Sequence, residues 1–227
     1  MILSILRSGA GPQTVFLEVC ALLLSVIIAI VMHELAHGFV ALKQGDYTAK
    51  IQGRLTFNPV KHFDPLGFLM MVLAGFGWAK PVPINPNYFK KYRKGLFLVS
   101  IAGVVTNVIL AIIFALLFKF ITPLIPTNTI FFEFFAYFFF YGIMLNVSLA
   151  EFNLLPIYPL DGFRIIESFT RYDNKFCVFM RKYGVYVFIA LVGLSYIASY
   201  LSIPYLDVIG AFTGLIKKAI FSIIGLF

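Results

Sequence analysis

The chain contains a long apolar run, residues 15–42, that ends in three side chains able to carry charge. A run of this length can cross a bilayer as a helix, because a transmembrane helix needs about 20 apolar residues. His33 and His37 are four residues apart within it, so they share one face of a helix and can bind one metal ion. Ionisable groups inside a membrane helix are costly, and they therefore indicate a functional site.

These two histidines belong to the stretch His33-Glu34-Leu35-Ala36-His37-Gly38, which has the His-Glu-x-x-His arrangement of zinc peptidases. Glu34 stands next to the first histidine, where a carboxylate can act as the general base that activates the attacking water. The alternative is a structural cluster of polar side chains. Such a trio, unpaired in lipid, would cost several kcal/mol, so we favour metal binding.

The composition of the chain is that of a polytopic membrane protein. It has 227 residues, of which 61% are hydrophobic, and its mean hydropathy is +0.94. That apolar share is far above the share in a soluble domain. The formal net charge is +8. In so apolar a chain we interpret the basic residues as anchors on the cytoplasmic side of a membrane, and not as a surface for nucleic acid.

Three further apolar segments are long enough to cross a bilayer, at residues 95–120, 130–155 and 183–201. A last apolar stretch, residues 206–227, is interrupted by two lysines, so it is either a second span or an amphipathic helix lying at the interface. We therefore expect an all-α polytopic membrane protein with about five to six membrane segments.

Two shorter elements break the pattern of long apolar helices. Residues 47–57 predict a small β-hairpin, because strand-forming residues flank Gln52-Gly53 and Asn58-Pro59 closes the segment. Residues 66–78 are apolar but too short to span a bilayer. We expect this segment to be a re-entrant element near the active site, which enters the membrane and returns to the same side.

The distribution of Lys and Arg predicts the orientation of the chain. The loops around 43–61, 79–94 and 162–182 are basic, whereas the loop around 121–129 contains neither Lys nor Arg. By the positive-inside rule the first three loops are cytoplasmic and the fourth is outside. The N-terminus is then outside, and the His-Glu-x-x-His motif lies within the membrane near its cytoplasmic side.

A third metal ligand is expected, because a catalytic zinc takes three protein ligands and keeps one position open. Asp161 is the best candidate. It follows the segment 130–155 at the depth of the histidine pair, and Pro156, Pro159 and Gly162 around it indicate an unwound backbone that can turn a carboxylate inward. The alternative is a helix N-cap, a position where Asp is common.

These motifs, in this order, resemble the site-2 protease family of intramembrane zinc metalloproteases. The matching stretches are His33-Glu34-Leu35-Ala36-His37-Gly38; Gly53-Arg54-Leu55-Thr56 with Asn58-Pro59, His62, Asp64-Pro65 and Gly67; Ser100-Ile101-Ala102-Gly103 with Asn107; and Asn153 with Pro156 and Pro159-Leu160-Asp161-Gly162. The second stretch is similar to the compact subgroup that lacks PDZ and CBS domains. The resemblance covers about residues 20–170. Val104 and Phe163 depart from it, since the family commonly has Pro and Gly there, but neither is a proposed ligand.

The resemblance implies that His33, His37 and Asp161 bind one zinc ion per chain and that Glu34 is the catalytic base. It also implies an endopeptidase that cuts a single-pass transmembrane protein or peptide within the lipid bilayer. The alternative function is a membrane transporter or metal-permeation protein. A transporter would spread ionisable residues along a path through several helices, and it would have no need of Glu34.

The resemblance further implies a single transmembrane metalloprotease domain over residues 1–227, with a catalytic core at about 15–170 and C-terminal helices at 183–227. It places the protein in a bacterial or archaeal plasma membrane. A helix hides its peptide bonds, so a transmembrane substrate must unwind before attack. A strand edge would hold it extended, and residues 47–57 and 82–85 are the two candidates for that edge.

Four remaining polar residues each have a functional and a structural interpretation. Asn153 is a candidate donor to the developing oxyanion or to the substrate backbone. Asn107 and Asn146 are better explained as hydrogen-bonded bridges between membrane helices. His62, the third histidine, is either a group that supports the metal ligands or a structural residue of its loop.

Overall fold

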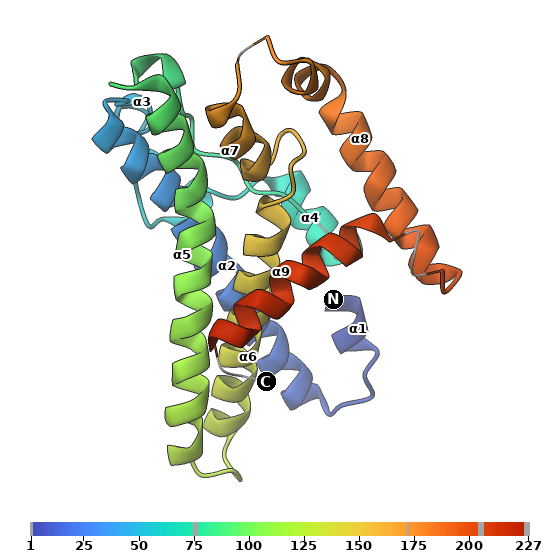
Figure 1. Ribbon diagram of the computed structural model, residues 1–227. Helices are drawn as coiled ribbons and strands as arrows, with labels where there is room; N and C mark the ends of the chain where they lie inside the picture. Colours follow the sequence, from blue (N-terminus) through green and yellow to red (C-terminus); the bar gives the residue numbers. More distant parts are fainter. Residues whose placement is uncertain (1, 75–76, 172, 204–206, 225–227) are drawn as a thin grey trace.

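Three long helices form the centre of the protein: α2 (Pro12–Gln44), α5 (Tyr92–Phe120) and α6 (Ile130–Asn153). They pack against one another along much of their length, as the computed structural model in Figure 1 shows. The structure describes residues 2–74, 77–171, 173–203 and 207–224. Throughout these ranges it is helical apart from turns and connecting segments, which confirms the all-α prediction.

The remaining elements surround this bundle. Two further long helices follow at the C-terminal end, α8 (Lys175–Tyr200) and α9 (Val208–Ile224). In Figure 1 α9 crosses in front of the bundle, while α8 stands to one side of it. The short elements are α1 (Ile2–Leu6), α3 (Thr48–Ile51), α4 (Pro65–Ala74) and α7 (Asp161–Phe169), with the 3-10 turns η1 (Pro59–Lys61), η2 (Pro86–Tyr88) and η3 (Thr122–Leu124).

Four helices in the described ranges are long and apolar enough to cross a membrane. They are Pro12–Gln44, Tyr92–Leu124, Ile130–Asn153 and Lys175–Ala198, and they contain the four spans expected from the sequence almost entirely. The last one begins eight residues before its predicted start at Tyr183. The basic residues in that first part led us to predict a loop, but helix α8 continues through them.

The last apolar stretch forms α9, although Leu206 and residues 225–227 of the predicted segment lie outside the described residues. Its Ile220 and Phe221 are buried and join the hydrophobic cluster that Phe114 and Phe139 form between α5 and α6. Burying that face explains why α9 lies against the bundle. That α9 is either a further membrane span or an amphipathic helix at the interface stays a prediction.

The predicted β-hairpin at residues 47–57 is wrong. The chain forms the short helix α3 there, and Asp46 Oδ1 accepts a hydrogen bond from the Thr48 N–H at 2.9 Å at its start. Gly53 has a positive φ of 61°, and the N–H of Arg54 returns to the Ala49 carbonyl at 2.9 Å. That is the C-terminal cap of a helix. The Gln52-Gly53 pair therefore closes a helical turn and does not join two strands.

The segment around α4 leaves the bundle and returns to the same place. Phe63 and Ala79, on either side of it, form an isolated antiparallel bridge. The Lys80 N–H donates to the His62 carbonyl at 2.9 Å. The two flanks of α4 therefore lie side by side, as a segment that dips and returns requires. Residues 75–76 of the predicted re-entrant element lie outside the described residues.

A close contact between α5 and α6 depends on Gly142. A Cβ at this position would lie 2.5 Å from ring atoms of Phe114, which is only 5% exposed. Phe114 in turn makes an edge contact with Phe138, at a centroid distance of 5.3 Å, so its ring is packed on that side as well. The two helices can approach each other this closely only because residue 142 has no side chain.

We therefore predict that Gly142→Ala destabilises the bundle by about 1–3 kcal/mol, the usual cost of overpacking a core. Gly193→Ala on α8 is the matched control, because a Cβ there meets nothing within 4 Å. The measurement is the thermal unfolding of both purified variants in the same detergent. Equal midpoints for the two variants would contradict this account of the interface.

Candidate metal centre and active site

The last turns of α2 bring His33 and His37 onto one face, as their four-residue spacing predicts. Both side chains are buried, and their Nε2 atoms lie 3.0 Å apart. The Nδ1 atom of His33 lies 2.6 Å from Asn107 Oδ1, and that of His37 lies 2.7 Å from the Val99 carbonyl. Both Nδ1 atoms therefore face oxygen acceptors on α5, and each must be the donor in its bond.

The orientation of Asn107 is itself determined by a chain of buried hydrogen bonds. Its Nδ2 donates to Asn146 Oδ1 at 2.8 Å, and the Nδ2 of Asn146 donates to the Gly142 carbonyl at 2.8 Å. Since a carbonyl can only accept, the direction of every bond in this chain follows. The chain ends with Asn107 Oδ1 accepting from His33. Both asparagines bridge helices as expected, and Asn107 also orients a histidine.

Asp161 is the third candidate ligand, and it lies beside the Nε2 atoms of both histidines. It is the first residue of α7, and its Oδ2 lies 3.4 Å from His33 Nε2 and 3.1 Å from His37 Nε2. The ordinary pKa of a carboxyl lies well below neutral pH, and a cation between these three atoms would keep this one ionised.

Helix α7 is held in place by contacts on both sides. It packs against α5, and its Phe163 is 1% exposed with its ring edge against Tyr158. Glu167 accepts a hydrogen bond from Arg181 of α8 as an ion pair. Phe163, one of the two departures from the family pattern, thus fills part of the core. Val104, the other departure, is buried in the cluster between α5 and α6.

The three converging atoms fit a divalent metal ion. With each Nδ1–H donated to an oxygen, a neutral imidazole has only a lone pair at Nε2. Asp161 Oδ2 is buried and has no hydrogen-bond donor among the described residues. Two nitrogen lone pairs and a carboxylate oxygen, all within 4.8 Å of one another, would repel without a cation between them. Two imidazoles and one carboxylate are a usual donor set for catalytic zinc.

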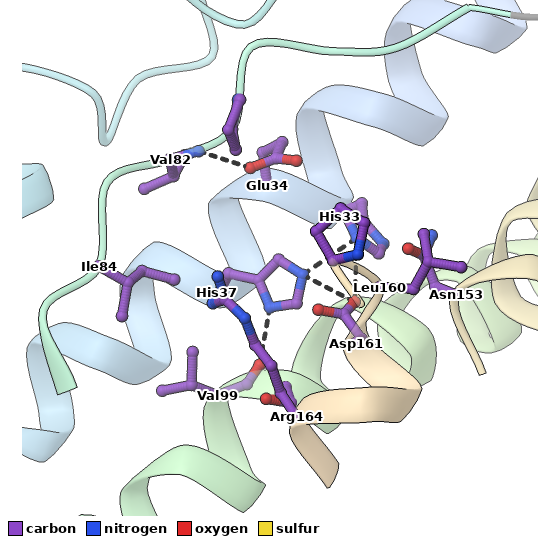
Figure 2. Close-up of a pocket in the computed structure, with 13 residues that line it drawn as sticks. His33, Glu34, His37, Val82, Ile84, Val99, Asn153, Leu160, Asp161 and Arg164 are labelled. Carbon is purple, nitrogen blue, oxygen red and sulfur yellow. Dashed lines mark hydrogen bonds and ion pairs between the residues drawn. The ribbon is translucent and has the colours of Figure 1, made fainter. Parts of the chain in front are cut away.

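Glu34 lines the same pocket but is not one of the converging candidate ligands. The pocket has a volume of about 140 Å³, and all three candidate ligands and Glu34 line it. Glu34 Oε2 accepts a hydrogen bond from the Val82 N–H at 2.7 Å (Figure 2). The carboxylate is thus held beside the candidate metal ligands by the segment that follows α4. In this position it can exchange a proton with a water in the pocket.

The remaining sequence candidates have different outcomes. Asn153 lines the pocket, and its Nδ2 donates one hydrogen bond to Leu149 of its own helix at 2.9 Å. Figure 2 shows it beside His33 and Asp161. His62 does not line the pocket. It is fully buried in its loop, where its Nε2 lies 2.8 Å from the Thr56 carbonyl.

Sequence reasoning missed two features of the pocket. The first is the Val82 backbone N–H, which no side-chain motif can reveal. The second is Arg164, which lines the pocket (Figure 2). Its position three residues after Asp161 on a helix was the available signal, because that spacing places both side chains on one face.

Comparison with known proteins gives a consistent result. The family model described as "Peptidase family M50" matches residues 21–194. Among the relatives whose names begin "Putative zinc metalloprotease" are the following two. YwhC of Bacillus subtilis (strain 168) is 45% identical over 82% of this chain and 85% of its own. Rip2 of Mycolicibacterium smegmatis is 30% identical over 62% of this chain and 54% of its own. No solved structure matches the chain.

Gly103 of α5 provides a test of the site that removes no ligand. A Cβ at this position would lie 2.5 Å from His33 Cε1 and 2.6 Å from His37 Nε2. We predict that Gly103→Ala displaces the two imidazoles and lowers the zinc affinity by about 10- to 100-fold, the range seen when groups around a metal site are disturbed. Gly214→Ala, where a Cβ meets nothing within 4 Å, is the control.

The measurement is the zinc content of both purified variants after dialysis against a graded series of chelator concentrations. The site as described requires that the Gly103→Ala protein lose its zinc at a lower chelator concentration than the control. Identical retention in the two variants would mean that the imidazoles do not converge beneath Gly103.

Proposed function

The chain belongs to peptidase family M50, the site-2 protease family, and on that premise we propose that His33, His37 and Asp161 hold its zinc ion and that Glu34 is its general base. The protein is an intramembrane zinc metalloprotease, a hydrolase built from apolar helices. The proposal assigns this activity to particular side chains. It is supported most directly by the convergence of two proton-free nitrogens and one carboxylate oxygen in a single pocket.

The chemistry of the site follows from these assignments. When bound, zinc polarises the scissile carbonyl and lowers the pKa of water, so that hydroxide forms at neutral pH. Glu34 takes a proton from the water while the water oxygen forms a bond to the carbonyl carbon. It then passes this proton to the amide nitrogen as the C–N bond breaks. The products are a carboxylic acid and an amine, and Glu34 returns to its ionised state.

Asn153 is proposed to bind the substrate backbone. One of its two amide N–H groups is used within its own helix, so the other remains for a carbonyl or an oxyanion in the pocket. Its side chain lies on the His33 side of the pocket, opposite to Val82 (Figure 2). A substrate between them would meet the free amide N–H of Asn153, while the Val82 N–H is already used by Glu34. His62 lies outside the pocket and is assigned no contact with the substrate.

The proposed substrate is the transmembrane segment of a single-pass membrane protein or peptide, unwound before it is cut. Of the two candidate strand edges, the hairpin at 47–57 does not form, so residues 82–85 remain. The N–H of Val82 faces Glu34, and in an extended segment the N–H and carbonyl of Ile84 face the same side. Pro81 and Pro83 have no N–H to offer. We propose that the substrate pairs along this edge.

The proposed domain is a single unit over residues 1–227, with its catalytic core at about 15–170 and C-terminal helices at 183–227. The protein is an integral membrane protein, and we propose that it resides in the plasma membrane of a bacterium or archaeon. Residue 79 lies beside residue 63, so the chain after α4 returns to the point where it left. This supports α4 as a re-entrant element. The excess of Lys and Arg in loops 43–61, 79–94 and 162–182 supports a cytoplasmic location for them.

The zinc assignment predicts that His33→Ala/His37→Ala removes almost all zinc from the purified protein, because one carboxylate cannot hold the ion alone. Glu34→Gln should retain one zinc per chain, while its cleavage rate falls by about 10²- to 10⁴-fold, the usual contribution of a general base. The measurements are zinc content and cleavage of a panel of tagged single-pass segments, with and without chelator.

Two outcomes of this experiment would count against the proposal. Full zinc retention in the double histidine variant would show that the ion binds elsewhere. Unchanged cleavage by Glu34→Gln would show that another group moves the proton. A transporter would give a third pattern, in which Glu34→Gln alters ion flux into vesicles and the wild-type protein cleaves no segment.

The orientation predicts that Gln52 and Asn87 lie on the same, cytoplasmic side of the membrane. Both positions are exposed, so cysteines placed there can be labelled after Cys20 and Cys177 are replaced by Ser. Asn128 in the loop 121–129 is the control for the opposite side. Labelling of intact cells with a membrane-impermeant maleimide should reach Asn128→Cys only. If Gln52→Cys and Asn87→Cys differ, the segment between them spans the membrane.

A further inference from the structure

One peptide unit, between Pro81 and Val82, is bound by charged side chains at both of its polar atoms. Its N–H donates to Glu34 Oε2 at 2.7 Å, and its carbonyl accepts from a terminal nitrogen of Arg54 at 3.1 Å. The same nitrogen of Arg54 donates to the Lys80 carbonyl at 2.8 Å. In a trans peptide unit the N–H and the carbonyl point in opposite directions. Glu34 and Arg54 therefore lie on opposite sides of this unit.

The surroundings of Arg54 show that it is committed to this segment. The residue is 8% exposed, and its Nε is buried without a hydrogen-bond partner in the described ranges. Among those residues no carboxylate forms an ion pair with it, and the hydrogen bonds of its side chain go to the two backbone carbonyls. A buried guanidinium stabilised only by carbonyls fixes their position strongly, because hydrogen bonds from a charged donor are about twice as strong as neutral ones.

The position of Arg54 is itself determined by the cap of α3. Its backbone N–H returns to the Ala49 carbonyl at 2.9 Å, directly after Gly53 with its φ of 61°. This cap turns the chain so that the Arg54 side chain reaches the segment after α4. The turn that sequence reasoning assigned to a hairpin thus serves to present a cation to the active-site segment.

The ends of the segment are anchored separately. The Lys80 N–H donates to the His62 carbonyl at 2.9 Å. The Asn85 N–H donates to Asp46 Oδ2 at 2.7 Å, and Asp46 is 1% exposed. Arg54 acts between these two anchors, directly at the peptide unit that contacts Glu34. The other anchors can hold the segment in place without controlling how that one unit is rotated.

We propose that Arg54 is a positioning residue for catalysis, which acts on Glu34 through the peptide unit between Pro81 and Val82. By holding the carbonyl, Arg54 aims the opposite N–H at Glu34 Oε2. That bond removes rotational freedom from the Glu34 carboxylate and leaves its second oxygen to exchange protons in the pocket. The proposal rests on the role of Glu34 as general base given above, and adds a residue that does not line the pocket.

The test compares Arg54→Met and Arg54→Lys with the control Arg93→Met, which changes an exposed arginine at the start of α5. The probe is the tagged single-pass segment of the panel above that the wild-type protein cleaves fastest. Arg54→Met should lower kcat per zinc-loaded molecule by about 10- to 100-fold, the cost of misplacing a catalytic group by a fraction of an ångström. KM is measured alongside, because Arg54 also holds the start of the edge that is proposed to bind the substrate, and the proposal is tested by the loss in kcat.

The lysine variant separates positioning from stability. Lys keeps the charge but cannot donate through a planar guanidinium, so Arg54→Lys should recover kcat only in part. A purely structural role predicts a different pattern. The fraction of folded, zinc-loaded protein would fall in Arg54→Met, while kcat for each loaded molecule stayed at the wild-type value. That pattern would overturn the proposal.

Hydrogen–deuterium exchange provides a readout that does not depend on activity. In peptides covering residues 79–85, both Glu34→Ala and Arg54→Met should speed the exchange of the Val82 amide, and Arg93→Met should not. If Glu34→Ala has this effect and Arg54→Met has none, the proposal is wrong. If the wild-type protein cleaves no segment, the proposed function fails instead, and the exchange result still tests whether Arg54 holds this peptide unit.

Discussion

The arrangement of the site depends on which ring nitrogen of each neutral histidine carries the proton. His33 and His37 donate their Nδ1–H groups to Asn107 Oδ1 and to the Val99 carbonyl, both on α5. These bonds leave two lone pairs facing each other and facing Asp161. A neutral imidazole cannot donate from both nitrogens, so the acceptors on α5 leave two lone pairs at the centre of the pocket, an arrangement suited to a cation.

The packing of the bundle serves this arrangement. The chain of amides from Asn107 through Asn146 to the Gly142 carbonyl joins α5 to α6, and so the helix interface and the histidine orientation share one set of hydrogen bonds. Gly103 leaves room for the two imidazoles between α2 and α5. A membrane interior offers no water to compensate an unmade bond, which explains why these buried polar groups form a connected chain.

The sequence predicts those parts of this arrangement that depend on long apolar runs or on the spacing of nearby residues. The apolar runs predicted the four long helices, and the spacing of His33 and His37 predicted a shared face. The prolines before Asp161 indicated a break in the helix, and the carboxylate does lie beside the two histidines, while its role as a ligand stays a prediction. The first turns of α8 were missed, since the basic side chains that we assigned to a loop are tolerated on a helix.

Other parts could not be predicted because backbone geometry decides them. Gln52-Gly53 suits both a hairpin turn and the cap of a short helix, and only the bond from Thr48 to Asp46 and the return of Arg54 to Ala49 distinguish the two. The contact of Glu34 with Val82 involves a main-chain N–H that is the same in any sequence. Side-chain motifs give no information about such a contact.

The central claim is that two imidazoles and one carboxylate, and no sulfur, bind the zinc of this protein. X-ray absorption at the zinc edge of the purified Glu34→Gln protein tests this directly, because that variant retains the proposed ligands. The account predicts a first shell of nitrogen and oxygen at about 2.0–2.2 Å, with the outer scattering of two imidazoles. Scattering from sulfur at about 2.3 Å, which would have to come from Cys20 or Cys177, or the signal of fewer than two imidazoles, would contradict it.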